Sequence, residues 1–76
     1  MQFDLITYNK EILNGKPIIK GTRISVEIIM EWIASGASVE DIYKEHVHLP
    51  KGSVEQAIQY AARFIENEIL IEEEIT

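Results

Sequence analysis

The 76-residue sequence contains no cysteine, few aromatic side chains, few basic side chains and no long apolar run. Without thiols the chain has neither a disulfide framework nor a thiolate metal site, which is typical of a reducing compartment. No apolar stretch approaches the roughly 20 residues that a membrane-spanning helix needs, and the sequence does not open with a signal-peptide pattern. We therefore expect a cytoplasmic protein that does not enter a membrane.

The apolar content is sufficient for one small domain. Hydrophobic residues make up 46% of the chain, which is globular rather than disordered usage. We expect residues 1–76 to form a single domain, because the chain is too short for two. A domain of this size buries only about 60% of the surface of its unfolded chain, so a lone monomer is marginally stable. A homodimer would relieve that shortage of buried surface, and we expect one.

The net charge of −6 is unevenly distributed along the chain. Residues 1–24 contain four basic and two acidic side chains, whereas residues 25–76 contain three basic and eleven acidic side chains. Basic surfaces attract nucleic acid and acidic surfaces repel it. The segment 1–24 is therefore the part of the chain that we expect to face an anion.

Residues 1–24 are expected to form a β arm. Apolar stretches at residues 5–7 and 18–20 favour two paired strands, with a helical turn that closes on Gly15 between them. Gly21 permits a turn with positive φ, and Ser25 offers a side-chain oxygen to the first N–H groups of a helix. The sequence therefore predicts a short N-terminal β arm or hairpin joined to a helical body.

Residues 25–68 are expected to form that body from three helices. Gly36 suits the left-handed cap that ends the first helix, and Ser38 caps the start of the second. Ser53 and Gln56 have the spacing of a capping box at the start of the third helix, which continues with a 3.6-residue apolar period. The fold class predicted is mainly α, a three-helix helix-turn-helix arrangement.

Two parts of the chain carry side chains suited to DNA. Glutamine can read adenine and arginine can read guanine from the third helix, and basic residues of the arm can neutralise phosphates. The DNA-binding candidates are Lys16, Lys20, Arg23, Gln56, Gln59 and Arg63. The third helix has one cation among several acids, so a solvated helix face is its alternative interpretation. For the arm, the alternatives are contact with a protein partner and a purely structural role.

The chain also has more apolar surface than one small core requires. An exposed β ribbon needs an edge partner, and tryptophan is enriched at the anchors of interfaces. The partner and dimer-interface candidates are Ile18, Ile19, Ile28, Trp32, Phe64, Leu70 and Ile71. The alternative for Trp32 is that it caps the core of the monomer.

No constellation of residues indicates catalysis or a cofactor. Ser25, Ser38 and Ser53 each precede an expected helix and are explained as caps. His46 and His48 lack a third arranged ligand, so we expect no metal site and interpret them as a helix-end and a loop histidine. With no phosphate-binding loop and no nucleophile beside a base, we expect a binding protein and not an enzyme.

Three short motifs carry a family resemblance: Gly15-Lys16-Pro17, Gly21-Thr22-Arg23 and Gly36-Ala37-Ser38-Val39-Glu40-Asp41-Ile42. Through them the chain resembles, over roughly residues 6–66, the domain-of-unknown-function family 433. Members of that family are described as small antitoxin-like proteins, often encoded beside a toxin with a PIN-like nuclease fold. The resemblance implies a homeodomain-like trihelical body and a PIN-like ribonuclease toxin as partner.

The expected function is therefore that of the antitoxin in a type II toxin–antitoxin pair, with repression of its own operon as an added role. One alternative is a helix-turn-helix transcriptional regulator that binds DNA, and another is a structural dimerisation module without DNA contact. Residues 69–76 form an acidic, apolar tail, and five glutamates lie between residues 66 and 76. In a basic nuclease cleft these acids would mimic RNA phosphates, whereas a solvated helix end is the other interpretation.

Overall fold

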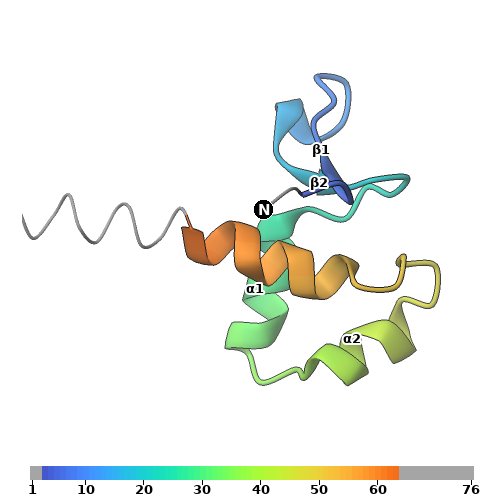
Figure 1. Cartoon of the computed structure of the whole chain (residues 1–76), viewed down its shortest axis with the longest axis vertical. Coiled ribbons are helices and arrows are strands. Elements are labelled where there is room, and N and C mark those ends of the chain that lie inside the picture. Colours follow the sequence, from blue (N-terminus) through green and yellow to red (C-terminus); the bar gives the residue numbers. More distant parts are fainter. Residues whose placement is uncertain (1–2, 64–76) are drawn as a thin grey trace, which may run out of the picture.

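The computed structural model describes residues 3–63 of the chain. Three helices and a two-stranded antiparallel sheet make up this part (Figure 1). This confirms the mainly helical architecture with an N-terminal β hairpin. The interface candidates Phe64, Leu70 and Ile71 and the tail at residues 69–76 lie outside the described residues.

The N-terminal hairpin consists of β1 (Ile6–Thr7) and β2 (Ile18–Ile19), which pair with Ile6 opposite Ile19. The predicted turn that closes on Gly15 is present as the 3₁₀ element η1 (Leu13–Gly15). All three of its residues have positive φ, at 51°, 57° and 80°, although two of them are not glycine. A left-handed φ costs a non-glycine residue roughly 1–2 kcal/mol, so the hairpin holds this connection in a strained conformation.

A tight turn at residues 20–23, which we call the 20–23 turn, connects β2 to the first helix. The backbone N–H groups of Ile19 and Thr22 donate to the carbonyl oxygens of Ile24 and Ile19 at 2.8 and 3.0 Å. The Thr22 hydroxyl donates to the Ile19 carbonyl as well, at 2.8 Å. Gly21 has a φ of 81°, which supplies the positive φ that such a turn requires.

The first helix, α1 (Val26–Ala34), begins and ends as the sequence predicts. The Ser25 side chain caps its start by accepting a hydrogen bond from the backbone N–H three residues on, at 3.0 Å. At the other end Gly36 has a φ of 106°, and the Ala37 N–H donates to the Trp32 carbonyl oxygen at 3.0 Å. This is the hydrogen bond of a Schellman motif, which requires the left-handed glycine.

The second helix, α2 (Val39–Glu45), begins with the predicted capping box. The Ser38 N–H donates to the Asp41 carboxylate and the Asp41 N–H donates to the Ser38 hydroxyl, both at 3.0 Å. The backbone N–H of Ser38 contributes most to a lowered pKa of the Asp41 carboxyl, and the Ser38 hydroxyl contributes next. His46 closes the helix through its N–H, which donates to the Ile42 carbonyl oxygen at 2.9 Å.

The third helix spans residues 53–63 of the described part, and its start differs from the prediction. The Gln56 N–H donates to the Gly52 carbonyl oxygen at 3.0 Å, so the helix already includes Ser53. The predicted capping box between Ser53 and Gln56 is wrong. The Gln56 side chain instead accepts a hydrogen bond from the Leu5 N–H at 3.0 Å, because the chain entering β1 presents an otherwise unpaired donor there.

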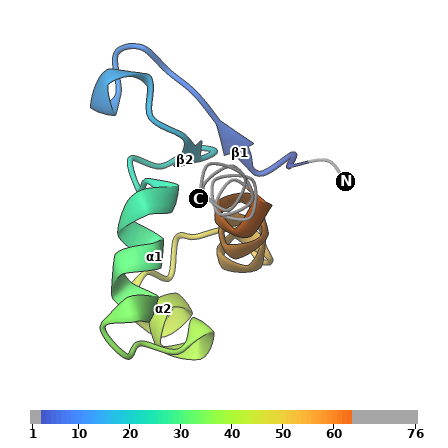
Figure 2. The same ribbon diagram turned by 90° about the vertical axis from the view of Figure 1, so that its left-hand side faces the viewer.

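Seven buried residues from every part of the fold form the core. They are Ile19, Val26, Ile29, Ile42, Leu49, Val54 and Ala57. The third helix crosses α1, with α2 at one end of this pair and the hairpin at the other (Figures 1 and 2). Within the described residues 3–63, no helix has the length and hydrophobicity needed to cross a bilayer.

The hairpin is packed against the helices and does not extend as a free arm. Ile18 and Ile19, which the sequence predicts as interface candidates, are only 2% and 0% exposed. Both side chains are buried within the chain itself, so a partner cannot reach them in this arrangement. The reason is that β2 continues into the cap of α1, where Ile18 bridges to Ser25 and the Val26 N–H donates to the Pro17 carbonyl at 3.0 Å.

Candidate interaction surfaces

One surface hollow, which we call the basic groove, joins residues that the sequence predicts for different roles. Its volume is about 850 Å³, and its walls come from the end of β1, the 20–23 turn, α1 and the residues after α2. Arg23 was predicted for DNA, and Ile28 and Trp32 for a protein partner; all three line this groove, together with His46 and His48. None of the described residues that line it is acidic.

An aromatic stack forms one wall of the basic groove. The rings of Trp32 and His46 lie nearly parallel, 7° apart, with their centroids separated by 4.4 Å. His48 meets His46 edge-on at 6.2 Å. The sequence predicts His46 as a helix-end residue but carries no local signal for this stack, because Trp32 and His46 come together only when α1 and α2 pack.

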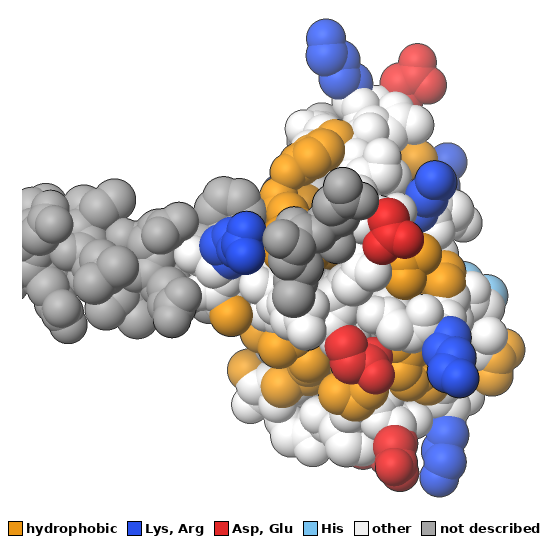
Figure 3. Space-filling view, viewed as in Figure 1, with side chains coloured by type: hydrophobic (Ala, Val, Ile, Leu, Met, Phe, Trp, Pro, Cys, Tyr) orange, Lys and Arg blue, Asp and Glu red, His pale blue; other side chains and the backbone are white. Residues whose placement is uncertain are grey.

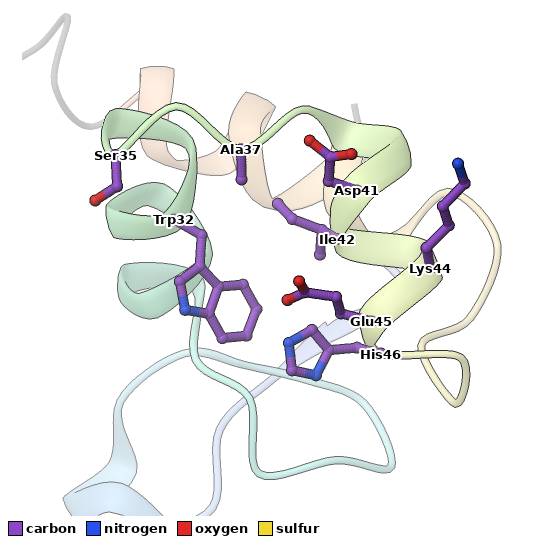
Figure 4. A pocket seen from close by; sticks show the side chains of 8 residues that line it. All are labelled: Trp32, Ser35, Ala37, Asp41, Ile42, Lys44, Glu45 and His46. Carbon is purple, nitrogen blue, oxygen red and sulfur yellow. The ribbon is translucent and has the colours of Figure 1, made fainter.

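A smaller hollow of about 370 Å³ lies beside the same stack, between α1 and α2 (Figure 4). The side chain of Glu45 reaches toward the His46 ring in this view, whereas Lys44 points outward. Asp41 also lines the hollow, but its carboxylate is engaged in the capping box. Across residues 3–63, no group of three or more His, Cys, Asp or Glu side chains is placed to hold a metal ion.

A third hollow, which we call the apolar groove, lies between the start of β2, α1 and the third helix. Its volume is about 470 Å³. The apolar residues that line it are Pro17, Val26, Met30, Ala34, Tyr60 and Ala61. Lys16, Glu27 and Glu31 line it as well, and the Lys16 ammonium lies 3.4 Å from the Glu27 carboxylate. Both charged groups are more than half exposed, so this ion pair contributes little to stability.

Two of the three DNA-binding candidates on the third helix are engaged by the N-terminal segment. The Gln56 amide accepts from the Leu5 N–H at 3.0 Å and donates to the Asp4 carboxylate at 2.7 Å. The Arg63 guanidinium lies 5.6 Å from the centre of the Phe3 ring, in cation–π contact.

The remaining DNA-binding candidates are exposed but do not form one surface. Gln59 is exposed on the third helix. Lys16 lines the apolar groove and Arg23 lines the basic groove, whereas Lys20 is exposed on the 20–23 turn. Charged side chains are likewise scattered over the face seen in Figure 3, where hydrophobic side chains gather in a band below the third helix.

Tyrosines connect the third helix to the rest of the fold. The hydroxyls of Tyr8 and Tyr60 are hydrogen-bonded to each other, and burial together with this bond raises the pKa of Tyr60 to about 12. The Tyr43 hydroxyl donates to Glu55 and accepts from the Val54 N–H at 3.1 Å. Burial raises the pKa of Tyr43, and the bond to Glu55 adds to the effect. These contacts are separated by 11 or more residues and have no sequence signature.

Comparison with known proteins gives one family match. A family model described as a protein of unknown function, DUF433, matches residues 6–61. This range includes both strands, α1, α2 and most of the described third helix. No curated protein and no solved structure matches the chain.

Proposed function

The chain belongs to the DUF433 family of proteins of unknown function, and from that starting point we propose that it is the antitoxin of a type II toxin–antitoxin pair. It neutralises a PIN-like ribonuclease by binding to it and not by catalysis. The partner class comes from the sequence resemblance, and the surface that we assign to the contact is the apolar groove.

The observation that carries this proposal is the composition of the apolar groove. Met30 and Ala34 of α1 face Tyr60 and Ala61 of the third helix across a hollow of about 470 Å³. Apolar surface that leaves water on binding contributes about 25 cal/mol for each Å² buried. A contact with apolar side chains of a partner would therefore be favourable here.

Charge at the edge of the groove supports a basic partner. Glu27 and Glu31 lie one helical turn apart on α1 and both line the groove, opposed by Lys16. A ribonuclease that draws RNA into its active site presents a basic surface, and complementary charge steers the two proteins together and fixes their orientation. The proposed contact thus combines an apolar centre with an acidic edge.

Co-expression tests this proposal. The reading frame beside the gene is expressed alone, with this protein, and with two matched variants. Ala34→Arg places a cation and a long side chain in the apolar groove, whereas Ala62→Arg makes the same change at an exposed site of the third helix outside the lining. We expect the neighbour to stop growth, and wild type and Ala62→Arg, but not Ala34→Arg, to restore it and to co-purify with the neighbour.

Two results would contradict the proposal. If the product of the neighbouring reading frame is harmless and never co-purifies with this protein, it is not the toxin partner. If Ala34→Arg restores growth to the wild-type level and forms the same complex, the apolar groove is not the contact surface.

A second function, DNA binding and repression of the chain's own operon, is favoured by the 20–23 turn. Lys20 and Arg23 are exposed on this turn, beside a groove whose lining within residues 3–63 includes no acidic side chain. A DNA complex held by phosphate contacts loses affinity steeply as salt rises. This function would be supported if the affinity for the promoter of the chain's own gene falls as salt rises and is lower still in Arg23→Glu. Equal, weak binding to any duplex would count against it.

A further inference from the structure

We propose that the basic groove receives the C-terminal segment, residues 64–76, of a second copy of the chain. Two copies then exchange their C-terminal segments, and the protein is a homodimer with two equivalent contacts. This inference does not rest on the antitoxin function, because it concerns this chain alone.

Charge complementarity identifies the occupant. The sequence contains 13 acidic side chains and a net charge of −6, yet the described residues that line the basic groove include Arg23, His46 and His48 and no acid. The segment 64–76 contains five glutamates and no lysine or arginine. Of the three hollows described within residues 3–63, the basic groove is the one whose lining includes no acidic side chain. The most acidic segment of the chain is therefore complementary in charge to this groove.

The apolar residues of the groove match the segment as well. Ile24, Ile28 and Trp32 line the groove between its polar groups. The segment alternates its acids with apolar residues, which are Phe64, Ile65, Ile69, Leu70, Ile71 and Ile75. An acidic peptide with apolar anchors can use both kinds of lining. A nucleic acid fits less well, since its affinity depends on phosphate contacts with Lys or Arg, and Arg23 is the groove's one such residue among those described.

The direction of the third helix favours a second copy over the chain's own segment. The helix starts beside the 46–52 loop, from which His48 enters the groove, and runs to the opposite side of the molecule (Figure 1). Eleven described residues at 1.5 Å each carry its end about 16 Å from its start. The described part of the helix therefore ends, at residue 63, on the far side from the groove of the same copy. Exchange between two copies also adds the buried surface that a small domain lacks.

A charge-swap experiment on the full-length chain tests the exchange. Arg23→Glu reverses the charge of the groove and leaves the segment unchanged. The triple variant Glu72→Lys, Glu73→Lys, Glu74→Lys reverses the segment and leaves the groove unchanged. In an equimolar mixture, each groove meets a segment of opposite charge. Lys51→Glu is the matched control, since Lys51 is exposed and lies outside the groove lining.

Sedimentation velocity at several protein concentrations gives the oligomeric state, and Trp32 fluorescence reports on the groove because Trp32 is the single tryptophan. We expect the wild type and Lys51→Glu to dimerise. We expect each charge-reversed variant alone to dimerise at least roughly tenfold more weakly, as the loss of a charged contact predicts. Mixing the two should restore a dimer and the wild-type Trp32 emission. In a mixture of Lys51→Glu with the triple variant, Lys51→Glu should form its own homodimer and the triple variant should remain largely unpaired.

Three outcomes would overturn the proposal. The first is a dimer that neither reversal weakens, which places the interface elsewhere. The second is a wild type that is monomeric at every concentration, together with a Trp32 emission that differs between the wild type and the triple variant. This result would place the segment in the groove of its own copy. The third is a wild-type monomer that binds duplex DNA through Arg23, which gives the groove to nucleic acid. Failure of the antitoxin test leaves all of these measurements unaffected, so the two proposals fail separately.

Discussion

The contact between Gln56 and the N-terminal segment predicts a stability effect for a residue whose type alone suggests DNA reading. Gln56→Ala removes two hydrogen bonds, one from the Leu5 N–H at 3.0 Å and one to the Asp4 carboxylate at 2.7 Å. A hydrogen bond contributes about 0.5–1.5 kcal/mol, and the half-buried Leu5 N–H loses its acceptor, so the expected loss is roughly 1–3 kcal/mol in the free energy of unfolding. For a domain of this size each kcal/mol lowers the Tm by about 4–8 °C.

Urea and thermal unfolding followed by circular dichroism measure this loss. Gln59→Ala is the matched control, because Gln59 is exposed on the same helix, and its effect should stay within about 0.5 kcal/mol. A third variant, Gln56→Glu, keeps an acceptor for the Leu5 N–H but places a second carboxylate against Asp4. It should be destabilised at neutral pH, because two carboxylates held close together repel each other. Equal stabilities of Gln56→Ala and Gln59→Ala would refute the structural role of Gln56.

Three further predictions concern the helix ends and the tyrosine pair. Ser38→Ala should lower the free energy of unfolding by about 1 kcal/mol in urea titrations, because α2 loses its side-chain cap. The pKa of the folded-state Asp41 carboxylate is lowered chiefly by the Ser38 backbone N–H, which Ser38→Ala retains; this contribution is present at neutral pH and is lost as the pH falls below 3.8, so the stability of wild type and Ser38→Ala should fall together in acid. Tyr60 has a pKa of about 12 in the folded chain and about 10 when unfolded; stability should therefore be intact below pH 10 and fall as the pH rises toward 12, and Tyr60→Phe should flatten that fall in an alkaline titration followed by circular dichroism. Gly36→Ala should cost about 1–2 kcal/mol, since φ is 106° at this position, and an unchanged thermal midpoint would argue against the left-handed cap.

Local sequence signals were sufficient for most of the secondary structure. Ser25 and Ser38 cap α1 and α2 as predicted, and Gly36 ends α1 with positive φ. The pairing of residues 5–7 with residues 18–20 in an N-terminal hairpin was also predicted, and the structure pairs Ile6 with Ile19. These features depend on residues a few positions apart, whose backbone preferences and cap hydrogen bonds are the same in any fold.

The predictions that went wrong depend on contacts between distant segments. Gln56 has capping-box spacing from Ser53, but its side-chain amide accepts a hydrogen bond from the Leu5 N–H, 51 residues away in the sequence. Ile18 and Ile19 were expected at an interface because a β ribbon has open edges, yet the chain buries them itself. No local pattern distinguishes an isoleucine that packs on its own helices from one that packs on a partner.

The sequence predicts which types of residue take part in the candidate surfaces, but not how these residues are arranged in space. Arg23, Trp32 and Ile28 were each predicted as binding residues, for two different kinds of partner. Their meeting in one groove with His46 depends on how α1, α2 and the 20–23 turn pack. The separation of Lys16 from Arg23, which divides the predicted basic arm between two grooves, has the same origin.

The most direct test of the proposed function uses purified proteins. The protein encoded by the neighbouring reading frame, which the proposal identifies as a ribonuclease, is assayed on an RNA substrate while this protein is titrated into it. We expect wild type and Ala62→Arg to abolish the activity at a fixed stoichiometric ratio, and Ala34→Arg to inhibit at least roughly tenfold more weakly, because a charge is placed in an apolar contact. Ribonuclease activity that persists at a large excess of the wild-type protein would contradict it.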